Sequence, residues 1–432
     1  MDKLVIIGNG PLEGEVRISG AKNAALPSLA ASILTADTLH LTNLPMVRDI
    51  HTMCSLLQEM GLNVVLGDEE VSLFGGSINS HIAPYQLVKT MRASILVLGP
   101  LLARLGEAQV SLPGGCAIGA RPVDLHLSAL EKMGAEIKLE HGYIDAKAKR
   151  LKGAEIFFEK VTVTGTENIM MAATLAEGTT VLLNAAREPE VEDLAILLNA
   201  MGARIEGAGT DRIVIHGVDE LHGTHHSIIP DRIETGTYVC ATAVTRGRVS
   251  ITNTAPKYLG RFLEAMQRAG LPMELHENRI EVFPHDGLRP CDVETQPHPG
   301  FPTDMQAQFM ATMTQAKGVS TITETIFENR FNHVPELNRM GAHIQINGNT
   351  AVTSGVTPLS GAQVMATDLR ASASLVIAAL IADQETTIDR IYHLDRGYYD
   401  LEGKLRNLGA KIRRIKNGDS AVREAVDALS GS

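Results

Sequence analysis

The sequence contains no tryptophan, and aromatic residues make up only 4% of its 432 positions. Proteins that hold single-stranded nucleic acid stack the bases on aromatic side chains, so this shortage argues against such a platform. Cysteine is also scarce: Cys54, Cys116, Cys240 and Cys291 show neither a disulfide framework nor zinc-ligand spacing. We therefore expect a reduced, cytoplasmic protein with no metal site.

Long apolar runs are missing as well. The longest, such as 371–382, are shorter than the ~20 residues of a membrane-spanning helix. The first residues, MDKLVIIGNG, lack the basic and apolar segments of a signal peptide. With 39 basic and 50 acidic residues the net charge is −11, which disfavours a broad nucleic-acid or membrane surface. An anionic small molecule would need a locally basic pocket.

A repeated unit organises what is present. Six glycines follow a methionine, leucine or alanine and precede a leucine or alanine, at intervals of 73, 68, 68, 71 and 68 residues: Gly61, Gly134, Gly202, Gly270, Gly341 and Gly409. Apolar residues at helical spacing lead up to them, as in Val47, Ile50, Cys54 and Leu57. We expect each glycine to end an amphipathic helix as its C′ residue.

Each unit also contains a helix of small and apolar residues, for example 22–34, 168–176 and 370–382, which we expect to be buried. A β-branched run such as Thr179–Leu183 or Val319–Thr323 follows it. The pattern predicts units of strand, helix, strand, helix, strand, strand. Because about 70 residues bury a small core, six units should pool into two α/β lobes of three, with helices inside and sheets outside.

The stretch 222–230, closed by Pro230, marks the expected junction between the lobes. Its three histidines, His222, His225 and His226, lack carboxylate or thiol partners at ligand spacing, so a solvated loop is the prediction. The strands at 3–8 and 15–19 precede the first full unit and are free to complete either lobe.

Cations stand where this pattern places helix starts: Lys22, Arg92, Arg121, Arg330 and Arg396. A helix N-terminus carries partial positive charge and normally attracts Asp or Glu. A cation together with the free N–H groups of a helix start makes an anion site. Five cations at such unusual positions in an acidic chain therefore predict an anion-binding cleft.

The acidic residues leave alternatives open. Asp231 is predicted to cap its helix or pair with Arg232. Asp304 is a candidate general base, and equally a candidate cap of a buried helix. Cys116 lies in SLPGGCAIGARPVD (111–124), where it is either a reactive thiol favoured by nearby Arg121 or an incidental cysteine in a glycine-rich turn. No P-loop, GxGxxG unit, HExxH or GxSxG motif is present, so nucleotide hydrolysis, dehydrogenation, zinc proteolysis and serine hydrolysis lack support.

Several specific stretches together resemble one family, the UDP-N-acetylglucosamine enolpyruvyl transferases (1-carboxyvinyltransferases). They are SGAKNAALP (19–27), KTMRAS (89–94), SLPGGCAIGARPVDLH (111–126), NAAREPE (184–190), PDRIETGT (230–237), FPTDMQAQF (301–309), ENRFNHVPEL (328–337), ATDLRAS (366–372) and HLDRGY (393–398). The resemblance implies a two-lobed inside-out α/β barrel. One lobe would be 22–229 and the other 1–21 with 230–418, leaving 419–432 as a tail.

The resemblance also implies a reaction. Enolpyruvyl would pass from phosphoenolpyruvate to the 3′-hydroxyl of UDP-N-acetylglucosamine by addition and elimination, releasing phosphate, as the first committed step of peptidoglycan synthesis. Cys116 would donate the proton and bond to phosphoenolpyruvate, and Asp304 would be the base. The remaining implied site residues are, for phosphoenolpyruvate, Lys22, Asn23, Arg121, Arg330, Asp368, Arg370 and Arg396, and for the sugar nucleotide, Asn23, Arg92, Arg121, Pro122, Val123, Asp124, Leu125, Lys160, Val161, Thr162, Val163, Asp304 and Ile326.

No cofactor or metal is implied, and the expected state is a monomer or weak oligomer acting on small molecules alone. Two rival functions remain. The first is transfer to shikimate 3-phosphate on the same architecture, against which the loop cysteine argues. The second is a non-catalytic repeat ring or clamp, against which the acidic charge argues.

Overall fold

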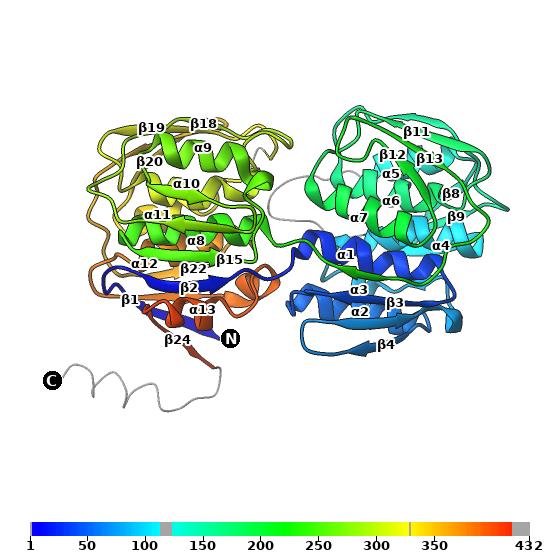
Figure 1. Ribbon diagram of the computed structural model, residues 1–432, viewed down its shortest axis with the longest axis horizontal. Helices are drawn as coiled ribbons and strands as arrows, with labels where there is room; N and C mark the ends of the chain where they lie inside the picture. The colour runs from blue at the N-terminus through cyan, green and yellow to red at the C-terminus, as the bar shows by residue number, and fades with distance from the viewer. Residues whose placement is uncertain (1, 113–122, 328–329, 417–432) are drawn as a thin grey trace.

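The computed structural model describes residues 2–112, 123–327 and 330–416, and it has two lobes side by side (Figure 1). Each lobe has its own cluster of buried apolar residues. One cluster runs from Ala21 to Ile228, and the other joins Leu4–Ile18 to Ile233–Ile412. The predicted two-lobed α/β architecture is confirmed.

The described residues form six four-stranded sheets that share one topology. In β10-β11-β13-β12, for example, the first two strands are parallel and the rest antiparallel. In the lobe carrying α1 the strands are β14 (His225–Ser227), β3 (Thr38–Thr42), β5 (Val71–Phe74) and β4 (Asn63–Leu66); β6 (Ile82–Ala83), β7 (Glu107–Ser111), β9 (Tyr143–Lys147) and β8 (Glu136–Glu140); and β10 (Glu155–Phe157), β11 (Thr179–Leu183), β13 (Arg212–His216) and β12 (Arg204–Glu206).

The other lobe repeats this order. Its strands are β2 (Glu13–Arg17), β15 (Arg248–Thr252), β17 (Arg279–Val282) and β16 (Met273–Leu275); β18 (Val293–Glu294), β19 (Val319–Thr323), β21 (Thr350–Ser354) and β20 (His343–Asn347); and β22 (Gln363–Met365), β23 (Glu385–Asp389), β1 (Lys3–Ile7) and β24 (Lys411–Ile415).

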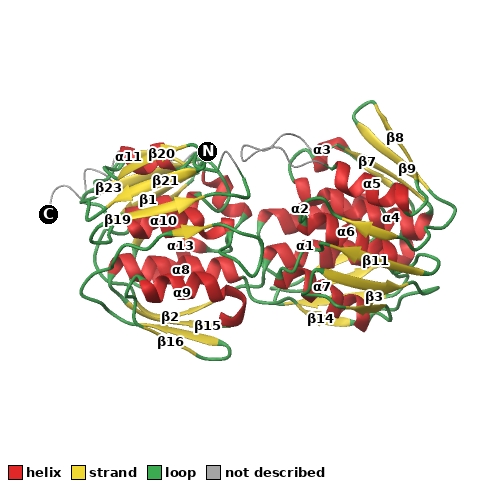
Figure 2. Cartoon of the chain, turned by 90° about the horizontal axis from the view of Figure 1, so that it is seen from above, coloured by secondary structure: helices red, strands yellow, loops and turns green. Residues whose placement is uncertain are grey.

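Helices fill the inside of each lobe, with the sheets around them (Figure 2). Apolar on nearly all sides, the inner helices bury almost every residue and pack on one another. They are α1 (Lys22–Ala31, continued by η1, Ser32–Leu34), η3 (Arg92–Val97) with α4 (Leu98–Leu105), α6 (Val163–Ala173), α8 (Arg232–Thr245), η5 (Thr303–Met305) with α10 (Gln306–Met313), and α12 (Ser372–Ala379).

The second helix of each unit is partly exposed. These helices are α2 (Arg48–Glu59), α5 (Asp124–Lys132), α7 (Pro189–Ala200), α9 (Gly260–Arg268, after η4, Pro256–Leu259), α11 (Val334–Arg339) and α13 (Leu401–Asn407). The short helices η2 (Gly75–Ser77), α3 (Tyr85–Val88) and η6 (Ile391–Arg396) lie between the main elements. The six repeat glycines have φ between 90° and 103°, which confirms that they end these helices in the left-handed region.

Both N-terminal strands complete the second lobe. β1 lies between β23 and β24, and β2 pairs in parallel with β15. The first unit therefore lacks a leading strand, and β14 supplies it by pairing in parallel with β3. The prediction of a solvated loop at 222–230 is thus wrong for His225–Ser227. His225 stacks on His40, and His226 is 2.9 Å from buried Asp193.

Two other predicted boundaries are corrected. The buried helix expected at 168–176 begins earlier, at Val163, because Thr162 caps it by accepting a hydrogen bond from the Gly165 amide. Arg330 and Arg396 do not stand at helix starts, since α11 begins at Val334 and α13 at Leu401. Carboxylates, rather than helix dipoles, surround these two arginines.

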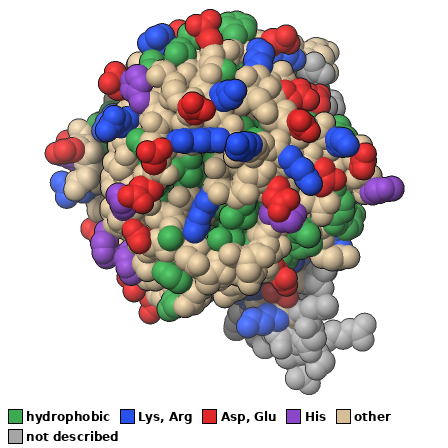
Figure 3. Space-filling view, turned by 90° about the vertical axis from the view of Figure 1, so that its right-hand side faces the viewer, with side chains coloured by type: hydrophobic (Ala, Val, Ile, Leu, Met, Phe, Trp, Pro, Cys, Tyr) green, Lys and Arg blue, Asp and Glu red, His purple; other side chains and the backbone are tan. Residues whose placement is uncertain are grey.

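The chain crosses between the lobes twice, at 18–21 and at 228–231. The two crossings pair with each other: the Ala21 amide donates to the Ile229 carbonyl at 2.7 Å, and the Asp231 amide to the Ser19 carbonyl at 2.9 Å. At the far end of the α1-bearing lobe, charges of both signs are interspersed over the surface (Figure 3). None of the described helices is long and apolar enough to cross a membrane.

Candidate active site

Lys22, the first residue of α1, lies at the interface between the lobes and is 5% exposed. Its ammonium is 3.1 Å from Oδ2 of Asp49, in the first turn of α2. Arg396, from η6 of the other lobe, reaches the same carboxylate, with Nε 2.8 Å from Oδ1 and Nη2 3.3 Å from Oδ2. One buried carboxylate therefore holds a lysine and an arginine from opposite lobes.

The charges of this group act on one another. Burial lowers the pKa of Lys22, Asp49 opposes that effect, and Arg370 and Arg396 lower the pKa further. For Asp49, burial alone would raise the pKa, but Lys22 and Arg396 together hold it below its usual value. The carboxylate thus stays ionised between two cations.

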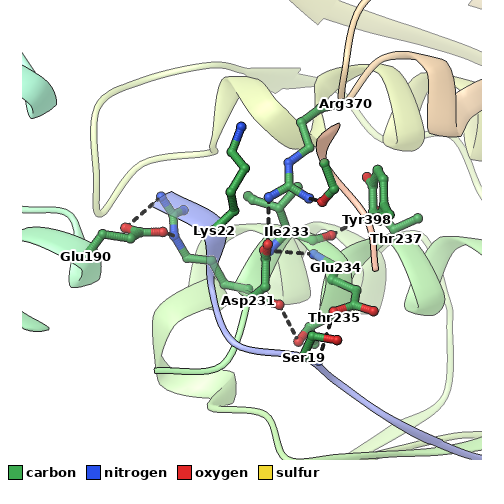
Figure 4. Close-up of polar contacts among 12 residues, drawn as sticks. Ser19, Lys22, Glu190, Asp231, Ile233, Glu234, Thr235, Thr237, Arg370 and Tyr398 are labelled. Atoms are coloured by element: carbon green, nitrogen blue, oxygen red, sulfur yellow. Dashed lines mark hydrogen bonds and ion pairs between the residues drawn. The ribbon is translucent and has the colours of Figure 1, made fainter. Parts of the chain in front are cut away.

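Arg370, just before α12, is 2% exposed on its side chain and lies close to Lys22 (Figure 4). Its Nη2 donates to Asp231 at 2.6 Å and its Nη1 to the Gly397 carbonyl at 2.7 Å, while its guanidinium lies over the Tyr398 ring. Asp231 also accepts from the amides of Ile233 and Glu234, so the predicted helix cap is confirmed. The alternative, a pair with Arg232, does not form, because Arg370 pairs with Oδ2 of Asp231 and Arg232 pairs with Glu190.

A second group of charged residues lies around Arg330. Its Nη1 is 2.6 Å from Asp304 and its Nε 3.5 Å from Asp368, whose other oxygen accepts from the Arg370 amide at 2.7 Å. Burial lowers the pKa of Arg330, but Asp304 and Asp368 outweigh that and raise it. Asp304 does not cap a helix, since η5 has Pro302 at its N-cap and no side-chain cap bond.

Carboxylates from the α1-bearing lobe meet another arginine across the interface. Arg232 Nε donates to Glu190 at 2.9 Å, and the His298 amide to Glu188 at 3.4 Å. Glu167, on α6, is 1% exposed. Burial, with Glu190 and Glu188 nearby, raises its pKa well above the usual value. The Asp49–Arg396 and Glu190–Arg232 ion pairs therefore both join the two lobes.

The residues implied for the sugar nucleotide gather mainly at three element starts in one lobe: Arg92 of η3, Val123–Leu125 at α5, and Lys160–Val163 at α6. Buried His126 and Asn168 connect these elements. The Asn168 amide nitrogen is 2.9 Å from His126 Nδ1 and 3.1 Å from the Ile95 carbonyl. Burial lowers the pKa of His126 to about 4, so the ring is neutral at pH 7.

The remaining expected residues fall as follows. Asn23 is partly buried in α1, and Ile326 is positioned by its amide, which donates to Glu324 at 2.8 Å. Cys116, Arg121 and Pro122 lie outside the described residues. Among the described residues, no group of three His, Cys, Asp or Glu side chains is placed to hold a metal ion.

Sequence patterns did not reveal Asp49, the Glu190–Arg232 pair or Glu324. An acidic residue in a first helical turn, such as Asp49 or Glu190, is ordinary and carries no functional signal by itself. Glu324 accepts from Thr295, Thr303 and two amides, and only the folded chain brings these together.

Two lobes of three repeats, with buried cations at their interface, define a class of two-lobed α/β proteins. Comparison with known proteins is more specific. The family model for EPSP synthase (3-phosphoshikimate 1-carboxyvinyltransferase) matches residues 6–405. The chain therefore belongs to the EPSP synthase family of enolpyruvyl transferases and is an enzyme of that kind.

Solved structures agree with this family. The enolpyruvyl transferase NikO from Streptomyces tendae is 27% identical with a TM-score of 0.88, over 96% of this chain and 99% of that one. An EPSP synthase from Acinetobacter baumannii has the same fold at 18% identity and a TM-score of 0.76, over 96% of this chain and 100% of that one. The expectation of an enolpyruvyl transferase is confirmed.

Proposed function

We propose that this enzyme transfers enolpyruvyl from phosphoenolpyruvate to the 3′-hydroxyl of UDP-N-acetylglucosamine, the first committed step of peptidoglycan synthesis. The observation that supports this proposal is that Lys22 and Arg396, from opposite lobes, form ion pairs with the same carboxylate, that of Asp49. Two polyanionic substrates need converging cations, and arginine gives bidentate contacts to phosphate and carboxylate.

Each cation has a proposed role. Lys22, Arg121 and Arg396 hold the phosphate of phosphoenolpyruvate, and Arg330 and Arg370 lie near its carboxylate. The carboxylate partners of Arg330 and Arg370 fix the direction of each guanidinium before substrate arrives. Such preorganisation spares the enzyme reorganisation during the reaction.

The proposed reaction has two steps, addition and elimination. A proton adds to the methylene carbon of phosphoenolpyruvate while the sugar 3′-oxygen bonds to the central carbon and gives up its proton to a base. In the second step the methyl carbon loses a proton and the C–O bond to phosphate breaks, which restores the double bond. Cys116 is the proposed proton donor of the first step, and Asp304, held by Arg330, is the proposed base.

The sugar-nucleotide side of the proposal rests on the sequence stretches of Arg92, Asp124 and Lys160–Val163, whose element starts are tied together by His126 and Asn168. We propose boundaries of 22–229 for one lobe and 1–21 plus 230–418 for the other. The segment 419–432 lies outside the described residues.

Shikimate 3-phosphate is the second candidate acceptor, favoured by the description of the matching family model. The loop cysteine of SLPGGCAIGARP favours the sugar nucleotide instead. Release of inorganic phosphate from phosphoenolpyruvate, measured with each acceptor in turn, separates the two. We expect turnover with UDP-N-acetylglucosamine; turnover with shikimate 3-phosphate alone would contradict the proposal.

A further inference from the structure

Asp49 is a buried carboxylate for which the family resemblance implies no role. It is 3% exposed, lies in the first turn of α2, and has both oxygens occupied by cations. Arg396 is separated from it by 347 positions in the sequence and belongs to the other lobe. Asp49 therefore forms ion pairs that join the two lobes.

We propose that Asp49 is a positioning residue for phosphoenolpyruvate, which keeps Lys22 charged and holds Arg396 beside it across the lobe interface. This inference rests on the phosphate-binding roles proposed above for Lys22 and Arg396. Asp49 itself touches no substrate in this account, because its oxygens are occupied by the two cations.

The charge balance supports this role. Lys22 and Arg396 bring two positive charges and Asp49 one negative charge, so the group keeps a net positive charge for an anion. Burial removes water from the Lys22 ammonium and lowers its pKa, and Asp49 raises it again. Without that carboxylate, Lys22 would lose its proton at a lower pH.

Other charged or titratable groups lie on the helices packed against α1, including Arg48, His51 and Glu59 of α2 and Glu192 of α7. Arg370 and Arg396 act on Lys22 and lower its pKa. The elements packed on α1 also bring Arg92 of η3, Glu167 of α6, and Glu190 and Asp193 of α7. The last two are paired with Arg232 and His226. Among the described residues, Asp49 is the carboxylate that forms an ion pair with the Lys22 ammonium.

A series of hydrogen bonds and ion pairs also connects this contact to the segments in which the chain crosses between the lobes. Gly397, next to Arg396, accepts from Arg370, which pairs with Asp231. The Asp231 amide in turn donates to Ser19, three residues before Lys22. Losing Asp49 removes the ion pair that holds Arg396 beside Lys22 where the two lobes meet.

The test compares Asp49→Asn with Asp193→Asn, a matched loss of a buried carboxylate in the same lobe that pairs with His226 at 2.9 Å. Calorimetry measures binding of phosphoenolpyruvate, and of inorganic phosphate as a simpler probe, across a pH series. In parallel, the rate of reductive methylation of Lys22 against pH, followed by mass spectrometry, reports its titration. Neither readout requires an acceptor, so both remain decisive if the proposed acceptor is wrong.

For Asp49→Asn we expect affinity for phosphoenolpyruvate to fall about tenfold or more near neutral pH. The loss should grow as pH rises, and Lys22 should titrate at lower pH than in the wild type. Asp193→Asn should leave both properties unchanged even where it lowers the melting temperature. Asp49→Glu should restore part of the affinity, and it serves as the test variant if Asp49→Asn does not fold. Wild-type affinity and wild-type Lys22 titration in a folded Asp49 variant would overturn the proposal.

Discussion

At the scale of single residues, the arginines of the lobe interface each face a carboxylate from another element: Arg370 faces Asp231, Arg232 faces Glu190, and Arg330 faces Asp304. Burying a charge is costly unless it is paired, and removing one partner leaves the other uncompensated. These pairs therefore fix the direction of each guanidinium, and the Arg232–Glu190 pair does so across the interface between the lobes.

Cys116 provides the most specific chemical prediction at this scale. If it acts as the proposed loop thiol, the epoxide fosfomycin should inactivate the enzyme by alkylating it. Cys116→Ala should slow this inactivation sharply, as measured by residual phosphate release and by the mass of the modified protein. A Cys116→Ala enzyme that still turns over and still loses activity to fosfomycin would contradict the assigned role.

His333 predicts a pH dependence of stability. It is fully buried, and burial lowers its pKa in the folded protein to about 4. Between about pH 6.5 and 4 the unfolded chain binds a proton there that the folded chain does not. The free energy of unfolding therefore decreases as the pH is lowered through this range. The loss should reach about 2 kcal/mol near pH 5. With His333→Gln, the denaturant midpoint should change less with pH over this range than in the wild type. His276→Gln, at an exposed histidine, should not have this effect.

At the scale of elements, the repeat made much of the fold predictable. β-branched runs such as Thr179–Leu183 and Val319–Thr323 coincide with β11 and β19. The start of α6 and the strand β14 were missed. Thr162 caps α6 from ahead of its apolar stretch, and β14 is polar and exists only because β3 offers it a free edge.

The repeat glycines predict a stability difference. Gly409 has φ of 95°, and a Cβ there would meet no atom, so Gly409→Ala tests the backbone conformation alone. It should lower the free energy of unfolding by about 1 kcal/mol. Gly260 begins α9 with φ of −46° and equally open space, so Gly260→Ala should be neutral or stabilising by up to about 1 kcal/mol. Denaturant titration compares the two, and equal effects would contradict this explanation.

At the scale of the whole molecule, the site depends on pairings that no local pattern contains. The sequence indicated that cations such as Lys22 and Arg396 gather in one cleft. It did not indicate that Asp49 joins them, because an acidic residue in a first helical turn carries no functional signal by itself. The same applies to β1, whose place between β23 and β24 is set at the other end of the chain.

That placement predicts the effect of an N-terminal deletion. Removing residues 2–7 would take out an inner strand of the sheet β22-β23-β1-β24 and expose apolar residues such as Leu4 and Ile6. Amide hydrogen exchange should then show lost protection within 233–412 and retained protection within 21–228. Equal loss in both lobes would contradict their independent cores.

Cooperation of the two lobes on one anion is the central claim, and kcat/KM for phosphoenolpyruvate in Arg396→Leu tests it most directly. Phosphate release with UDP-N-acetylglucosamine is measured for this variant, for Lys22→Met and for the wild type. Because charged hydrogen bonds to phosphate contribute about 1.5–3 kcal/mol each, we predict a loss of roughly tenfold or more from either lobe's cation. An Arg396→Leu enzyme with unchanged kcat/KM would contradict the account.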